Sequence, residues 1–127
     1  MGKKIFIVDD EPDILDFCKL VLETEGFEVQ TASSGLDLIK ELGNFKPDLI
    51  LLDVMMPDMD GWEVLRMLNN DDRYDKIPIA MLTAKTQAKD KILGIQEGAV
   101  DYITKPFAPD ELLERIGKIF SHIDTDK

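Results

Sequence analysis

The most informative segment of the chain is Asp48-Leu-Ile-Leu-Leu-Asp-Val-Met-Met-Pro-Asp-Met-Asp-Gly61. Its apolar run at 49–52 predicts a strand buried on both faces, as in a parallel sheet covered by helices. The run ends abruptly at Asp53, and Pro57 and Gly61 then break the chain. Asp53 is therefore expected at the carboxyl end of a strand, under a loop, where open α/β sheets bind ligands. For Asp53 alone, capping of the next turn is an equally good interpretation.

Outward from this segment, predicted strands and helices alternate. Besides 49–53, we expect strands at 4–8, 28–32, 79–82 and 101–103. The expected helices begin at Pro12, at Ser33 or Ser34, at Gly61, near Thr86 and at Pro109. This order predicts an α/β fold, a doubly wound parallel sheet of five strands with five helices. The flavodoxin-like strand order 2-1-3-4-5 is the common solution at this size.

Composition limits the class of protein. The chain has 127 residues, 44% of them hydrophobic and 32% charged, which predicts one globular domain with a real core. We expect this domain over 1–121 and a polar tail or the start of a linker over 122–127. No apolar run approaches the ~20 residues of a membrane span. The single Cys18 excludes an internal disulfide and indicates core packing, so we expect a cytoplasmic protein without membrane contact.

The charge balance bears on partners. The net charge of −11 argues against binding of nucleic acid by this domain alone, because the phosphate backbone is itself anionic. Acidic and polar residues nevertheless follow a spatial pattern. The first strand ends in Asp9 and Asp10, the third in Asp53, the fourth in Thr83, and the fifth runs into Lys105. Parallel strands present their carboxyl ends at one edge, so these side chains are expected to converge.

The chemistry of such a cluster can be inferred from its charges. Three carboxylates within a few ångströms repel one another, and a hard divalent cation removes the repulsion. Oxygen ligands suit Mg²⁺. A metal, an ammonium and a hydroxyl beside a carboxylate are the groups that phosphoryl transfer requires. Asp53 would be the nucleophile, and Lys105 and Thr83 would contact the transferring oxygens.

Four motifs together make the sequence similar to a known family. They are Val8-Asp9-Asp10-Glu11, the segment from Leu52 to Gly61, Leu82-Thr83-Ala84, and the segment from Gly98 to Phe107. In this order and spacing they resemble the receiver domain of two-component response regulators, of the chemotaxis-regulator type, from about Lys3 to Phe120. The resemblance implies a switch protein and not a metabolic enzyme. A sensor histidine kinase or phosphotransfer domain would donate the phosphoryl group.

The resemblance also implies a role for individual residues. Asp53 would be the phosphoacceptor. Asp10 and Asp53 would bind Mg²⁺ through their side chains and Met55 through its backbone carbonyl, while Asp9 would act through a metal-bound water. Such a receiver catalyses only its own phosphorylation and dephosphorylation. Its phosphoryl lifetime would depend on Met55 and Lys85, which stand where receivers vary.

Further expectations concern the response to phosphorylation. Lys105 and Thr83 would contact the phosphoryl group, and Tyr102 would be the switch aromatic that rotates inward. The Lys105–Pro106 bond would be cis, a geometry that physics alone would not predict. Trp62 is expected partly at the surface.

The same resemblance suggests self-association of the activated domain. Receivers joined to winged-helix DNA-binding domains pair through the fourth helix, fifth strand and fifth helix. Asp101 with Arg115, and Lys91 with Glu111, are candidate charge pairs across a two-fold axis. Pairing of Arg115 with Asp101 within one chain is the alternative interpretation.

Two other functions fit the fold class. An aspartyl-nucleophile, Mg²⁺-dependent phosphatase of the haloacid-dehalogenase type would need a second Asp two residues after the nucleophile, where this chain has Met55. A flavodoxin-type flavin-binding module would need a Ser/Thr/Gly-rich phosphate loop after the first strand. This chain has Asp9-Asp10-Glu11 there, which repels phosphate when no metal is bound.

Overall fold

The computed structural model describes residues 2–56, 58–84 and 98–125. Five parallel strands form one sheet in the order β2-β1-β3-β4-β5, which confirms the predicted order. The strands are β1 (Lys4–Val8), β2 (Glu28–Ala32), β3 (Leu49–Asp53), β4 (Ile79–Ala84) and β5 (Asp101–Lys105). In the described ranges there are four helices: α1 (Pro12–Thr24), α2 (Gly35–Glu41), α3 (Gly61–Asn69) and α5 (Pro109–Thr125). The fourth predicted helix, roughly over 86–97, lies outside the described residues.

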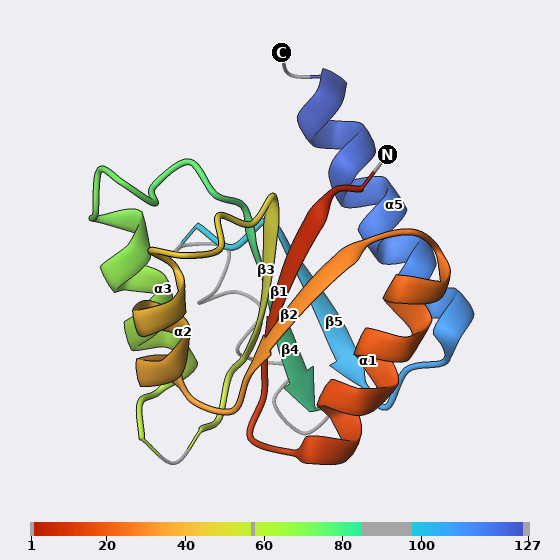
Figure 1. Cartoon of the computed structure of the whole chain (residues 1–127), viewed down its shortest axis with the longest axis horizontal. Helices are drawn as coiled ribbons and strands as arrows, with labels where there is room; N and C mark the ends of the chain where they lie inside the picture. Colours follow the sequence, from red (N-terminus) through yellow and green to blue (C-terminus); the bar gives the residue numbers. More distant parts are fainter. Residues whose placement is uncertain (1, 57, 85–97, 126–127) are drawn as a thin grey trace.

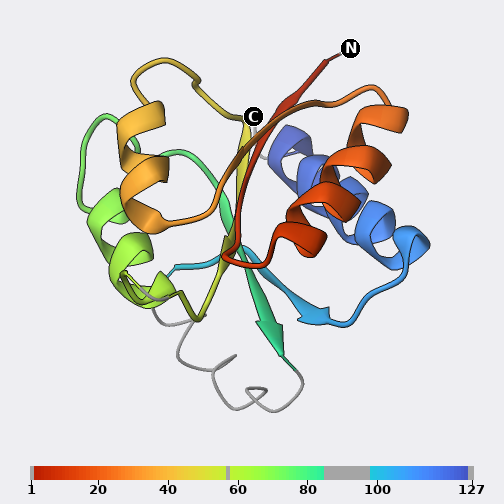
Figure 2. The same cartoon turned by 60° about the horizontal axis from the view of Figure 1, so that its bottom comes forward.

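The helices form two layers, one on each face of the sheet. α2 and α3 cover one face, and α1 and α5 cover the other (Figures 1 and 2). Side chains of β3 alternate between the layers: Ile50 and Leu52 join the cluster under α2 and α3, whereas Leu49 and Leu51 join the one under α1 and α5. All four are fully buried. Each such side chain stabilises the fold by ~1.5–3 kcal/mol, so β3 anchors both cores.

Two strands are longer than the sequence predicts. β4 continues to Ala84 and β5 to Lys105, because Thr83 pairs in register with Thr104, and Ala84 with Lys105. These extra residues lie at the carboxyl edge of the sheet. They therefore fix the two polar residues Thr83 and Lys105 on regular strands.

Helix boundaries follow local signals. Pro12 stands in the first turn of α1, and Gly26, with φ 92°, follows the end of this helix. The Ser34 side chain accepts a hydrogen bond from Asp37 N and caps α2, and Asp60 caps α3 by accepting from Trp62 N.

The last helix departs from the prediction. α5 runs through Thr125, into the stretch 122–127 that the sequence assigns to a tail. Ile123 continues the apolar stripe of Ile116 and Phe120 and packs against the same cluster, which explains the extension. No helix in the described part of the chain is both long and apolar enough to cross a membrane.

Candidate functional site

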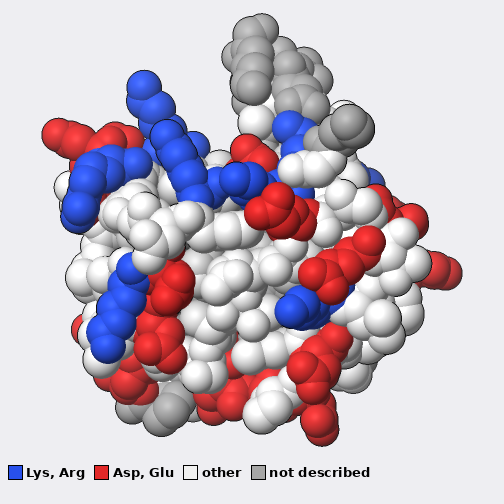
Figure 3. All heavy atoms as spheres, viewed as in Figure 1, with Lys and Arg blue, Asp and Glu red and all other residues white. Residues whose placement is uncertain are grey.

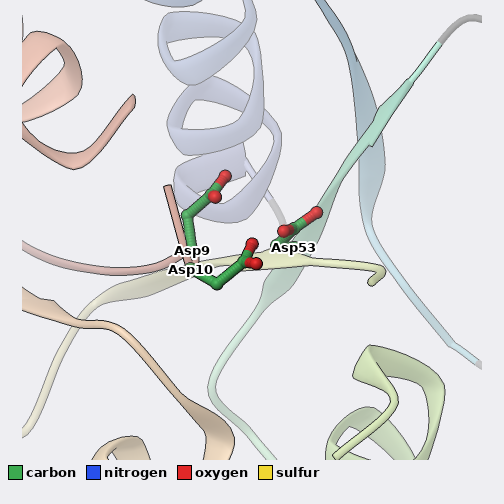
Figure 4. Close-up of side chains that lie close together, drawn as sticks. All are labelled: Asp9, Asp10 and Asp53. Atoms are coloured by element: carbon green, nitrogen blue, oxygen red, sulfur yellow. The ribbon is translucent and has the colours of Figure 1, made fainter. Parts of the chain in front are cut away.

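Three aspartates meet at the carboxyl edge of the sheet (Figure 4). Asp9 and Asp10 follow β1, and Asp53 is the last residue of β3. One carboxylate oxygen from each lies within 4.8 Å of the others. Asp9 is 0% and Asp53 5% exposed, whereas Asp10 reaches solvent. The sequence therefore predicts correctly that these three side chains converge.

Lys105 lies in the same cluster. Its Nζ is 2.7 Å from Asp9 Oδ2, 3.4 Å from Asp53 Oδ1 and 3.8 Å from Glu11 Oε1. Burial alone would lower the pKa of this ammonium, but the hydrogen bond with Asp9 and the charge of Asp53 outweigh it, so the pKa is raised. Lys105 is therefore a fixed cation shared between two buried carboxylates.

The charges in the cluster do not balance without a further cation. Burial, and after it the charge of Asp9, raises the pKa of Asp53 from 3.8 to about 7, although Lys105 opposes the shift. Ionised Asp53 is thus costly in the metal-free protein. Oxygen donors alone, with one carboxylate open to solvent, fit a hard divalent cation such as Mg²⁺ that keeps some of its water.

The resemblance implied a further ligand from the loop after β3, the backbone carbonyl of Met55. Met55 is 65% exposed and offers no side-chain oxygen, so only its backbone carbonyl is available as a ligand. The position two residues after Asp53 thus lacks the second carboxylate that the phosphatase alternative requires.

Gly61 closes this loop, a role that the sequence analysis missed. Its N–H donates to Val54 O at 2.8 Å, and a Cβ on it would lie 2.3 Å from Asp53 O. Only glycine leaves room for the backbone that carries Asp53. The Asp60-Gly61 pair at the start of α3 was the available sequence signal.

The two predicted switch residues lie on neighbouring strands, two positions apart in register: Thr83 pairs with Thr104, and Tyr102 pairs with Met81. Thr83 is 1% exposed at the end of β4. Tyr102, on β5, is 7% exposed, and its ring packs on Trp62 with centroids 6.3 Å apart. Tyr102 is therefore already turned inward, and the expectation that it moves inward on phosphorylation needs revision. Trp62 is 6% exposed, so its predicted partial exposure is wrong: the Tyr102 ring covers it.

The peptide bond between Lys105 and Pro106 is cis, the geometry that the resemblance implied. Next to it in space, Asp9 Oδ1 accepts a hydrogen bond from Glu11 N at 2.9 Å. Asp9 is thereby held by the start of α1 as well as by Lys105. Cys18 is fully buried, as predicted, and burial with the charge of Asp9 raises its pKa to about 12.

Of the four residues predicted for self-association, the three that the structure describes have partners within the chain. Arg115 Nη1 lies 3.3 Å from Asp101 Oδ1, so the intrachain alternative describes this structure. Glu111 accepts a hydrogen bond from Ala108 N at 2.9 Å and caps the start of α5. Lys91 lies outside the described residues.

Charge is distributed unevenly over the surface. On the face drawn in Figure 3, acidic side chains gather along the lower edge, toward which β4 and β5 run in Figure 1. Lysines and arginines gather toward the opposite edge. Cations are therefore drawn toward the edge that holds the three aspartates.

Comparison with known proteins shows the family to which this chain belongs. Residues 5–117 match the family model of the response regulator receiver domain. The chain is 48% identical over 121 residues to the alkaline phosphatase synthesis transcriptional regulatory protein PhoP of Bacillus subtilis, covering 94% of this chain and 49% of that protein. It is 41% identical over 116 residues to the DNA-binding response regulator MtrA of Mycolicibacterium smegmatis, covering 91% and 50%. The chain thus spans about half the length of these relatives.

Solved structures with a similar fold are also response regulators. A CheY-like response regulator receiver domain protein from Methanospirillum hungatei is 31% identical with a TM-score of 0.90, covering 100% of both chains. The chemotaxis response regulator CheY4 of Vibrio cholerae is 32% identical with a TM-score of 0.87, covering 94% of this chain and 99% of that one. Neither the phosphatase nor the flavodoxin alternative is needed to account for the site. With a family match over most of its length, the chain belongs to the receiver domains of two-component response regulators.

Proposed function

We propose that Asp53 accepts a phosphoryl group from a phosphohistidine on a sensor histidine kinase or phosphotransfer domain. The observation that carries this proposal is the buried contact of Asp53 with Asp9 and Lys105 at the end of β3. The charged form of this buried carboxylate is unfavourable in the metal-free protein, so the group is suited to react once cations bind beside it. The domain would extend through the end of α5 at Thr125, beyond the boundary at 121 that the sequence predicts.

The reaction can be written for the residues present. A carboxylate oxygen of Asp53 attacks phosphorus, the new O–P bond forms, and the P–N bond to the imidazole breaks, after which the leaving imidazole takes a proton from solvent. Lys105 neutralises charge on one phosphoryl oxygen, and the Thr83 hydroxyl donates a hydrogen bond to another. Hydrolysis of the acyl phosphate later restores Asp53.

Asp9, Asp10, Asp53 and the Met55 carbonyl would hold Mg²⁺. When bound, this ion supplies charge neutralisation for the carboxylates and for the transferring group. Asp10, open to solvent, is the residue best placed to admit it, while buried Asp9 orients the cluster through Lys105 and Glu11 N.

The switch would couple Thr83 to Tyr102. Because Tyr102 already packs on Trp62, we propose that phosphorylation stabilises this arrangement and does not create it. New charge-assisted hydrogen bonds to the phosphoryl group would draw Thr83 toward Asp53. The Tyr102 ring would then have less space to move outward from its packed position.

The wider role is inferred from the relatives. PhoP and MtrA are named as transcriptional or DNA-binding regulators, and this chain matches about half of each. We infer that the receiver regulates such an output in the cytoplasm of the cell. This domain by itself would contact the kinase, not nucleic acid, because of its net charge of −11.

Labelling with acetyl phosphate, read by intact mass, tests the assignment. The wild-type protein should gain one phosphoryl group in Mg²⁺ and none in EDTA, and Asp53→Asn should gain none because an amide is a poor nucleophile. Asp72→Asn, which removes an exposed acid from the loop before β4, is the control and should label normally. Undiminished labelling of Asp53→Asn would refute the proposed phosphoacceptor.

Self-association on activation is a second proposal. Asp101 and Arg115 are paired within the chain, but an exposed pair contributes only ~0–1 kcal/mol and could exchange across a two-fold axis. Val100, which is 48% exposed beside them, would add apolar contact. Sedimentation with Mg²⁺ and beryllofluoride should show a dimer that Arg115→Ala weakens. A wild-type species that stays monomeric at high micromolar concentration would leave only the intrachain pair.

A further inference from the structure

Asp58 connects the loop that follows Asp53 to a helix far away in sequence. Its two carboxylate oxygens accept hydrogen bonds from Gly35 N at 3.3 Å and from Leu36 N at 3.1 Å. These amides form the first turn of α2, which lies beside α3 on one face of the sheet (Figure 1). The contact spans 22 to 23 residues of sequence, so it is tertiary and not a local turn.

The two ends of the same loop are held by other contacts. Val54 N donates to Leu82 O of β4 at 3.1 Å, and Gly61 N donates back to Val54 O at 2.8 Å. Asp60 caps α3. Between these ends lies Met55, whose carbonyl is the proposed backbone ligand. The Asp58 carboxylate ties the following part of the loop to α2 by hydrogen bonds, and Met59 lies beside the same turn of α2.

The α2 side of the contact is rigid enough to act as an anchor. Gly35 is buried, and a Cβ on it would lie 2.9 Å from Val64 Cγ2 and 3.4 Å from Met59 Cβ. The start of α2 is therefore packed against both the loop and α3. A carboxylate at a helix N-terminus is further favoured by the helix dipole and by the unpaired first-turn N–H groups.

From this geometry we propose that Asp58 is a positioning residue for the Mg²⁺ site. By holding the loop against α2, it keeps the Met55 carbonyl where the metal requires it, and metal binding in turn tightens the start of α2. Groups that orient metal ligands are known to affect metal affinity without touching the ion. The proposal rests on the proposed Mg²⁺ site, and its tests separate the two.

Titration calorimetry with Mg²⁺ provides the first test. Asp58→Ala should weaken Mg²⁺ binding roughly tenfold, the low end of the range for residues that orient metal ligands. Two controls match it. Ser34→Ala removes the other cap of α2 but leaves the loop anchored, and Asp37→Asn removes an exposed negative charge from the same helix turn. Both should stay within about twofold of wild type, since neither alters the bonds that orient the ligand loop.

Each result of the Mg²⁺ titrations leads to a different conclusion. Equal Mg²⁺ affinity of Asp58→Ala and wild type would overturn the positioning role while leaving the metal site intact. Equal weakening in all three variants would also overturn it, because helix stability or charge would then account for the loss. Absence of Mg²⁺ binding by wild type would overturn the metal site and the positioning role together. Should Asp58→Ala not fold, Asp58→Asn, which keeps one acceptor, should show an intermediate loss.

Amide hydrogen exchange gives an independent readout. Because coupling between sites is reciprocal, Mg²⁺ should slow exchange of the Gly35 and Leu36 amides in the wild-type protein. The same addition should have no such effect in Asp58→Ala, and it should still slow exchange in Asp37→Asn. Exchange at these amides that does not respond to Mg²⁺ in wild type would contradict the proposed link.

Discussion

Replacing Asp53 by Asn should stabilise the metal-free protein at pH 8. Asp53 is 5% exposed beside Asp9, and burial together with that charge raises its pKa from 3.8 to about 7. At ~1.4 kcal/mol per pKa unit, ionised Asp53 costs the folded state about 4 kcal/mol relative to the unfolded chain. Asn has the shape of the protonated acid without its charge, so about 4 kcal/mol is the upper limit of the expected gain.

The stability gained by Asp53→Asn over wild type should increase as pH rises. Between about pH 4 and pH 7 the folded protein keeps a proton on Asp53 that the unfolded chain has lost. The free energy of unfolding of wild type therefore falls as pH rises through this range. Asp53→Asn lacks this contribution, so the difference between the two proteins should be near zero around pH 4 and largest above pH 7.

Urea unfolding in EDTA at several pH values, followed by circular dichroism, measures this difference. Asp72→Asn, at an exposed site, should track wild type throughout. Adding Mg²⁺ should stabilise wild type more than Asp53→Asn, so the difference in their free energies of unfolding should become smaller. The reasoning would be refuted if Asp53→Asn is no more stable than wild type at pH 8. It would also be refuted if the difference in their free energies of unfolding does not change with pH.

Three further predictions concern neighbouring residues. Gly61→Ala should lower the free energy of unfolding by about 2–3 kcal/mol in urea, because its Cβ would meet Asp53 O at 2.3 Å; a cost near zero would mean that the loop relaxes freely. Cys18 should resist a thiol reagent at pH 8 until urea unfolds the chain, since burial raises its pKa to about 12; rapid labelling of the native protein would argue against that burial. Beryllofluoride with Mg²⁺ should change Trp62 fluorescence in wild type, because the Tyr102 ring packs on Trp62; Thr83→Ala should still be phosphorylated by acetyl phosphate but lose this change, and the same change in both proteins would exclude Thr83 from the switch.

Sequence patterns predicted the parts of this molecule that depend on local order. The apolar run before Asp53 predicted a central strand, and the strand order followed from five alternating units. The convergence of Asp9, Asp10 and Lys105 followed because parallel strands end at one edge.

The remaining features depend on contacts between distant segments. The bonds from Asp58 to α2 join residues that no local pattern connects. The inward position of Tyr102 depends on Trp62, some 40 residues earlier. The length of α5 depends on whether Ile123 finds an apolar neighbour. Such packing is decided by the tertiary structure and not by helix or strand propensity.

The distances around Lys105 explain why the proposed reaction would need a second cation. Its ammonium lies 2.7 Å from Asp9 and 3.4 Å from Asp53, so it is closer to Asp9 than to the proposed nucleophile. Burial and the charge of Asp9, which Lys105 only partly offsets, raise the pKa of Asp53 to about 7, so Asp53 is partly protonated near neutral pH, and a protonated carboxyl group is a poor nucleophile. A divalent cation on Asp9, Asp10 and Asp53 would ionise Asp53 and would also free Lys105 to turn from Asp9 toward a phosphoryl oxygen. In the proposed function, the unfavourable charge of the metal-free site would make phosphorylation depend on Mg²⁺, and a substitution that relieves it, such as Asp53→Asn, should gain stability and lose the reaction together.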